Sequence, residues 1–168
     1  CNPVPNWSGA TIEANATYQD STAAVRLAAS YATGDAPTVS RFTVTSLALE
    51  EDALDVRALA RWVDGSDPVT GERRGRELAS PDADLLLDGT MNMPKSFSLA
   101  VVLAPQLRAD FDALQDRIRN RTLRLWQREL NARRGAGGSI REPIARLEVV
   151  ELRHERSRAL DPHIHRHL

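Results

Sequence analysis

The residues that most clearly suggest chemistry are the four histidines of this 168-residue chain, all of which lie in its last 15 residues. In an extended strand alternate side chains share a face, so His163, His165 and His167 are expected to point the same way. The Asp-Pro pair at 161–162 favours a turn, which would bring His154 alongside on a neighbouring strand. Imidazole nitrogens bind metal ions at about 2.0–2.1 Å, so this spacing predicts a metal site.

Such a site would be suited to polarising an anionic substrate. Three neutral nitrogens leave the charge of a bound cation unbalanced and its remaining coordination positions open. A phosphodiester fits those positions, so the expected chemistry is Lewis-acid assistance to a reaction at phosphorus. The alternative is a histidine-rich segment that is merely solvated.

The elements expected around the histidines are both strands and helices. Residues 144–152 alternate apolar and polar side chains, which predicts a strand ending just before His154. Residues 107–125 carry apolar side chains at helical spacings, with arginines on the opposite face. Shorter elements are expected as a strand over 41–49 and as helices over 20–31, 54–63 and 96–104. The fold class expected is α+β, an antiparallel sheet with helices packed on one face and the metal on its central strands.

Composition sets broad limits on the class of protein. An apolar fraction of 42% is enough to form the core of one domain. The net charge of −1 does not by itself indicate a protein that binds nucleic acid. Lys95 is the only lysine among 22 basic residues. The remaining cations are arginines, which suit phosphate contacts, although the codon bias of a GC-rich genome gives the same composition.

Cysteine content and hydropathy bear on the compartment. The single cysteine excludes an internal disulfide. The sequence has neither an apolar run near 18 residues nor a signal peptide at its start, so we expect a cytoplasmic protein that does not enter a membrane.

Two motifs resemble those of a known family. Residues 88–99 (DGTMNMPKSFSL) resemble the D-x-T-F-S-x-P-K-S-x-S-x signature of the TrwC/TraI-type (MobF) conjugative relaxases. Residues 154–167 (HERSRALDPHIHRH) resemble their H-x-x-S-R-x-x-D-P-x-x-H-x-H motif. The resemblance covers roughly residues 62–168, whereas residues 1–61 match poorly. Because the chain ends inside an expected strand, residues 1–168 are interpreted as a single, partial relaxase domain truncated at its C-terminus.

The resemblance implies an activity and a ligand set. The family is a histidine-hydrophobe-histidine endonuclease, which nicks one DNA strand at a plasmid transfer origin and stays joined to it through a phosphotyrosine. It implies metal ligation by His154, His165 and His167, although His163 and His165 flank Ile164 and offer a competing pair. The cofactor expected is a divalent ion, Mg or Mn before Zn.

The resemblance also suggests catalytic and DNA-binding residues. Asp88 matches an acidic residue near the nucleophile, where a carboxylate can take the proton of a tyrosine. The alternative for Asp88 is a surface or turn residue. Lys95 and Ser96 match phosphate-contacting positions, or else simply begin a helix. The chain has two tyrosines, and Tyr18 is the first candidate nucleophile and Tyr31 the second, unless both are packing residues.

The partners that the resemblance implies are single-stranded DNA at the transfer origin, a conjugative coupling protein and accessory DNA-binding proteins. Three other interpretations stay open: a rolling-circle replication initiator, a zinc or iron enzyme acting on a small molecule, and a catalytically incomplete DNA- or metal-binding fragment. The arginine face over residues 117–128 either follows a DNA backbone or is a solvated helix face.

Overall fold

A computed structural model describes residues 11–18, 38–74, 86–157 and 159–168, and the side chains of residues 39–74, 86–157 and 159–168. The helix expected over residues 20–31 lies outside the described residues. Of the helices in the described part of the chain, none is both long enough and apolar enough to cross a membrane.

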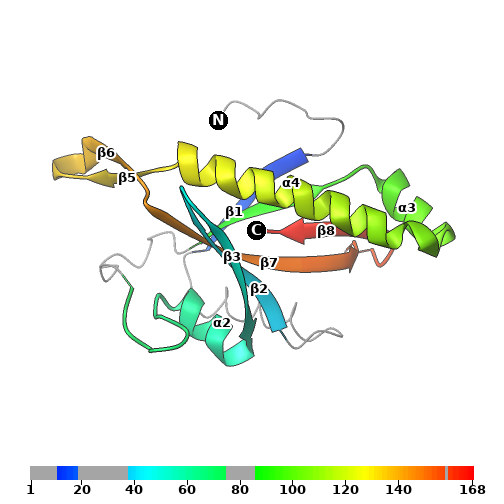
Figure 1. Cartoon of the computed structure of the whole chain (residues 1–168), viewed down its shortest axis with the longest axis horizontal. Helices are drawn as coiled ribbons and strands as arrows, with labels where there is room; N and C mark the ends of the chain where they lie inside the picture. The colour runs from blue at the N-terminus through cyan, green and yellow to red at the C-terminus, as the bar shows by residue number, and fades with distance from the viewer. Residues whose placement is uncertain (1–10, 19–37, 75–85, 158) are drawn as a thin grey trace.

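Six strands form one antiparallel sheet in the order β1-β4-β8-β7-β2-β3 (Figure 1). The two strands that carry all four histidines, β7 and β8, are therefore in its centre. The strands are β1 (Thr11–Tyr18), β2 (Thr38–Thr45), β3 (Leu49–Asp55), β4 (Leu86–Asn92), β7 (Arg146–Arg156) and β8 (Pro162–His167).

Three helices of the described residues pack on this sheet. They are α2 (Val56–Val63), α3 (Lys95–Leu103) and α4 (Arg108–Glu129). The carboxylate of Asp55 caps the start of α2 by accepting the backbone N–H of Ala58 at 2.7 Å. A short 3-10 turn at Pro105–Leu107 separates α3 from α4, because proline cannot continue the preceding helix.

The helices divide between the two faces of the sheet. In β2, Phe42 and Val44 pack with Leu123 of α4, whereas Val39, which points the opposite way, packs with Leu59 of α2. The helix α3 packs on the same face as α4, since both contribute to one cluster around Ile164 of β8. The α+β class is confirmed, with the two longer helices on one face and α2 on the other at the end of β2 and β3 (Figure 1).

The buried side of α4 differs from the apolar stripe expected from its sequence. Phe111 is buried as expected, but Leu107 and Leu125 remain 43% and 40% exposed. The sheet is instead contacted by a stripe that includes two polar side chains, Gln115 and Arg119. The expectation was wrong for these positions because two buried residues of the sheet pair with this stripe: Arg166 donates to Oε1 of Gln115, and Glu151 accepts from Arg119.

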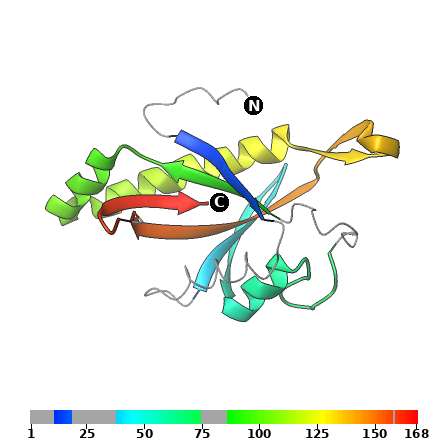
Figure 2. The ribbon, with the colours of Figure 1, turned by 180° about the vertical axis from the view of Figure 1, so that it is seen from behind.

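A separate hairpin, β5 (Asn131–Arg134) and β6 (Ile140–Pro143), extends from the end of α4 beyond the six-stranded sheet (Figures 1 and 2). Its turn relies on glycine, since Gly135, Gly137 and Gly138 all have positive φ. The sequence indicates this turn but not the strands beside it. All residues of the two strands except Glu142 are exposed, so no apolar alternation marks them.

Candidate metal centre

The register of β7 and β8 brings three histidines together. His154 on β7 lies directly opposite His165 on β8, and His167 follows two residues further along the same face. The ring centroids of His154 lie 4.9 Å from His165 and 4.8 Å from His167. One candidate ligand atom from each residue falls within 4.8 Å of the others, so the structure assembles the predicted set.

Two of these imidazoles are oriented by acceptors on their Nδ1 atoms. Nδ1 of His165 lies 2.8 Å from the carbonyl oxygen of His163, and Nδ1 of His167 lies 2.9 Å from Oδ1 of Asp88. A carbonyl and a carboxylate only accept hydrogen bonds, so both Nδ1 atoms donate and carry the proton. The lone pair of each ring therefore lies on Nε2, where it is available to a metal ion.

This arrangement distinguishes between the two candidate ligand pairs of β8, His163 with His165 and His165 with His167. His163 contributes its backbone oxygen to His165 and does not belong to the group of candidate ligands. Asp88 contacts His167, one of the three clustered histidines, and its expected role beside a nucleophile stays a prediction. The assignment of His154, His165 and His167 as ligands stays a prediction, and the geometry favours it over the competing pair.

Burial keeps the imidazoles of His154 and His165 neutral. Desolvation, together with the neighbouring His167 and His165, lowers the pKa of His154 to about 4. Desolvation also lowers the pKa of His165. A lowered pKa leaves the nitrogen lone pairs free of protons at neutral pH, which metal ligation requires.

The donor set fits a divalent ion. Nδ1 of His154 and Nε2 of His165 lie 3.2 Å apart. Two nitrogen ligands at about 2.0–2.1 Å from a tetrahedral ion are roughly 3.3 Å apart, close to that separation. Three neutral nitrogens would leave at least one coordination position for a substrate oxygen.

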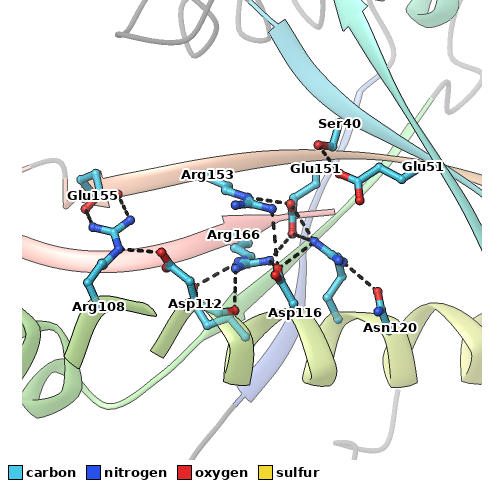
Figure 3. A network of polar contacts seen from close by, with 12 residues as sticks. Ser40, Glu51, Arg108, Asp112, Asp116, Asn120, Glu151, Arg153, Glu155 and Arg166 are labelled. Atoms are coloured by element: carbon cyan, nitrogen blue, oxygen red, sulfur yellow. Dashed lines mark hydrogen bonds and ion pairs between the residues drawn. The ribbon is translucent and has the colours of Figure 1, made fainter. Parts of the chain in front are cut away.

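On the opposite face of the sheet, Arg166 anchors the strand that bears two of the histidines. Its side chain is 1% exposed and points toward α4 (Figure 3). Its guanidinium donates to Glu151 at 2.7 Å, to Asp116 at 2.6 Å and to Gln115 at 3.1 Å. Arg119 also donates to Glu151, at 3.2 Å. Sequence reasoning missed this network, although the strict alternation along β8 does place Arg166 away from the histidines.

Ser98 forms a second anchor that the sequence did not reveal. It is fully buried in α3, and its hydroxyl accepts the backbone N–H of Ile164 at 2.9 Å. This bond ties the helix to β8 between His163 and His165. The serine belongs to the P-K-S-x-S stretch, so the motif itself was the available signal.

Gly89 permits close packing behind Asp88. A Cβ at this position would lie 2.7 Å from the ring of Trp126 on α4. The backbone of Gly89 exchanges two hydrogen bonds with Leu168, at 3.0 and 2.8 Å, which extends the pairing of β4 with the last strand. The absent side chain thus lets α4 press on the strand that carries Asp88.

The predicted DNA-contacting residues lie at the start of α3. Both Lys95 and Ser96 are exposed. Lys95 forms an ion pair with Asp161, in the turn that leads into β8, and Asp161 also accepts from Ser157. The first turn of α3 is thereby linked to the segment that connects His154 to the other two histidines, while phosphate contact stays a prediction.

The two candidate nucleophiles differ in what the structure says of them. Tyr18 is the last residue of β1, and its Cα is paired with Leu86 of β4. Two positions away, Ala16 is paired with Asp88, so the backbone of Tyr18 runs beside the strand that carries this acid. Tyr31 lies outside the described residues.

The comparison with protein families covers most of the chain. A family model described as TrwC relaxase matches residues 11–168, which include the segment 11–61 that carries neither sequence motif. The comparison with curated proteins found no match.

Solved structures of a conjugative relaxase, TrwC, resemble the chain. Its copper-bound complex with OriT DNA is 26% identical with a TM-score of 0.68, covering 94% of this chain and 55% of that one. Its metal-free complex with OriT DNA is 27% identical with a TM-score of 0.65, covering 94% and 54%. A complex with a 27-mer DNA comprising the recognition hairpin and the cleavage site is 25% identical with a TM-score of 0.63, covering 94% and 53%. The chain thus spans about half the length of these structures.

Proposed function

The chain belongs to the TrwC relaxase family, and from this premise we propose that it nicks and rejoins one strand of plasmid DNA at a transfer origin, initiating conjugative transfer. The observation that carries the proposal is the cluster of His154, His165 and His167, whose nitrogens converge within 4.8 Å on the central strands. The similar TrwC structures contain OriT DNA, and one of them is copper-bound, which supports a site for both DNA and a metal ion.

The proposed step is a transesterification at the scissile phosphate. The phenolic oxygen of a tyrosine, Tyr18 before Tyr31, forms a bond to phosphorus while the bond from phosphorus to the 3′-oxygen breaks. The tyrosine proton passes to a base, and the departing 3′-oxygen takes up a proton to become a hydroxyl. The phosphotyrosine conserves the bond, so attack by that hydroxyl reverses the step and rejoins the strand.

Residues of the chain assist at defined atoms. His154, His165 and His167 would hold the cation, which when bound supplies a Lewis acid for a non-bridging phosphate oxygen. Asp88 positions His167 by accepting its Nδ1 proton. Free tyrosine has a pKa near 10 and needs a base, and Asp88, on the strand paired with that of Tyr18, is the candidate to receive its proton.

The ligand chemistry narrows the choice of ion. Magnesium prefers oxygen ligands and keeps several waters, whereas imidazole suits first-row transition metals. Within the expected set of Mg, Mn and Zn, three histidine nitrogens favour Mn or Zn over Mg as the tightest binder.

The substrate and partners follow from the same premise. Single-stranded DNA at the transfer origin is the proposed substrate, with Lys95 and Ser96 on α3 contacting its phosphates. A coupling protein and accessory DNA-binding proteins are the proposed partners in conjugation. We place the reaction in the cytoplasm, where plasmid DNA is found.

The test is covalent capture of labelled DNA. A labelled single-stranded oligonucleotide library is incubated with the protein and Mn²⁺, Mg²⁺ or Zn²⁺, and run on a denaturing protein gel. The proposal expects label on the protein, lost with Tyr18→Phe and lost when His154, His165 and His167 are replaced by Ala. Loss with Tyr31→Phe alone would move the nucleophile, whereas no adduct with any metal would leave a DNA- or metal-binding fragment.

A further inference from the structure

The pairing of β7 with β8 is irregular next to the histidine cluster. Beyond the pair of His154 with His165 the register shifts, and the next paired positions are 156 and 162. A single residue of β7, Glu155, therefore lies opposite two residues of β8, His163 and Ile164. An extra residue in one strand is a β-bulge, and bulges are frequent beside active sites, where they redirect a side chain.

The backbone N–H of the bulge is bound by a helix. The N–H of Ile164 donates to Oγ of Ser98 in α3 at 2.9 Å, and Figure 1 shows α3 beside the start of β8. Ser98 is 0% exposed, so water cannot replace its hydroxyl as the acceptor. Serine hydroxyls within helices ordinarily face solvent or bond to their own helix. This one instead satisfies the backbone of another element.

The backbone carbonyl of the bulge is bound by a metal-ligand candidate. The oxygen of His163 accepts from Nδ1 of His165 at 2.8 Å. In a regular strand the carbonyl groups point along the sheet toward the neighbouring strand, whereas the side chains stand out from it. A side chain therefore meets the carbonyl two residues before it only where the backbone turns, as it does in a bulge.

Both of these hydrogen bonds are made by one peptide group. The carbonyl of His163 and the N–H of Ile164 belong to the same planar, rigid unit, in which the two groups point in opposite directions. Its N–H points to Ser98 on the face of the sheet that α3 and α4 cover. Its carbonyl points to His165 on the other face, since Arg166, the next residue, points toward α4. Fixing the N–H on one face thus fixes the carbonyl on the other.

We propose that Ser98 is a positioning residue for the metal centre, which acts across the sheet through the peptide that joins His163 to Ile164. Its hydroxyl holds the N–H, the carbonyl then holds the Nδ1 proton of His165, and the lone pair of this imidazole stays on Nε2. The inference rests on the proposed function, in which His165 is a ligand, and adds to it a residue that touches neither metal nor DNA.

The test reads the tautomer of His165 in the metal-free protein. Long-range proton–nitrogen NMR correlations distinguish an imidazole protonated on Nδ1 from one protonated on Nε2, at about pH 8, where histidine is neutral. The signals of His165 are identified by their absence in His165→Gln. Ser98→Ala removes the acceptor, and Ser98→Cys replaces it with a weak one that still fills the site. Val63→Ala, in a separate core cluster on α2, controls for a general loss of stability.

Both Ser98 variants should raise the ratio of the Nε2–H form to the Nδ1–H form of His165 by about 2–10-fold, the factor that one net hydrogen bond supplies. Zn²⁺ affinity in calorimetry should fall about tenfold in Ser98→Ala, the lower limit for a ligating histidine that loses its partner. Neither quantity should change in Val63→Ala. Nδ1 of His154, 3.2 Å from Nε2 of His165, is retained throughout, so a change of tautomer reports on the carbonyl.

An unchanged tautomer in the Ser98 variants, or an equal change in Val63→Ala, would overturn the inference. If Ser98→Ala does not fold, Ser98→Cys decides. Covalent capture of DNA is measured separately on the unmodified protein. An adduct together with an unchanged tautomer would refute this inference alone, and a shifted tautomer without any adduct would refute the proposed nicking alone.

Discussion

Within the histidine cluster, the orientation of His167 depends on one carboxylate. Asp88 accepts from its Nδ1 at 2.9 and 3.1 Å through the two carboxylate oxygens, which directs Nε2 toward the other histidines. Replacing such a partner of a ligating histidine lowers metal affinity by about 10–100-fold. We expect Asp88→Asn to weaken Mn²⁺ or Zn²⁺ binding by that factor in isothermal titration calorimetry.

The matched control for this prediction is Asp64→Asn, which changes an exposed acid at the end of α2. It removes the same charge without touching a histidine, so its metal affinity should equal that of the unmodified protein. Equal affinities in both variants would show that Asp88 does not orient a metal ligand.

Protonation of the buried histidines should make the metal-free protein sensitive to acid. The pKa of His154 is about 4 in the folded protein and 6.5 in the unfolded chain. Between these values the unfolded state binds more protons, so the free energy of unfolding should fall as pH decreases from 6.5 toward 4. The slope for this proton is at most about 1.4 kcal/mol per pH unit, and less because the ring is only half-buried.

Urea denaturation between pH 7 and about 4.5, in the presence of a chelator, measures this slope. The variant His154→Gln lacks the titrating group and should show a shallower slope, with the remainder due to His165. A slope unchanged by this substitution would mean that the acid sensitivity arises elsewhere in the protein.

At the scale of elements, the sequence predicts those that bury an apolar face and misses those that do not. The alternation of residues 144–152 predicts β7. The helical spacing over 107–125 predicts that α4 exists, although two members of the expected stripe, Leu107 and Leu125, remain exposed. The strands of the hairpin are almost wholly exposed and carry no such pattern. β1 pairs with β4, which lies about 75 residues further along the chain, and no local sequence pattern indicates the strand β1.

The tie between α3 and β8 can be tested with two serines on the same helix. Ser98→Ala removes the acceptor for the buried N–H of Ile164, and leaving such a donor unsatisfied costs about 1–3 kcal/mol. Ser96→Ala changes an exposed position and should alter stability by no more than about 0.5 kcal/mol. Chemical denaturation of both variants gives the comparison, and similar losses in the two would contradict a specific role for Ser98.

Across the whole molecule, the histidine cluster was predictable but its support was not. Three histidines on adjacent strands can be placed together from alternation and one turn signal. The buried network joins Arg166 to Gln115 and Asp116, about 50 positions earlier, and its existence depends on how α4 lies across the sheet (Figure 3). Charged residues in a sequence normally indicate solvent-exposed positions, so the sequence pattern alone gives no reason to expect that these side chains are buried.

The same network leads to a prediction about the stability of β7 and β8, the two strands that carry the histidine cluster. Arg166 and Glu151 are 1% and 2% exposed and are joined at 2.7 Å. Removing one member of a buried pair leaves an uncompensated charge and costs about 3–5 kcal/mol, which Arg119 beside Glu151 should reduce toward the lower limit. We expect Arg166→Met to lower the free energy of unfolding by about 3 kcal/mol. Replacing both as Arg166→Met with Glu151→Leu should cost less than the sum of the single changes, because the second substitution removes the buried carboxylate that has lost its closest partner. Urea denaturation of the four proteins yields this coupling energy, and additive losses would show that the two side chains are stabilised independently.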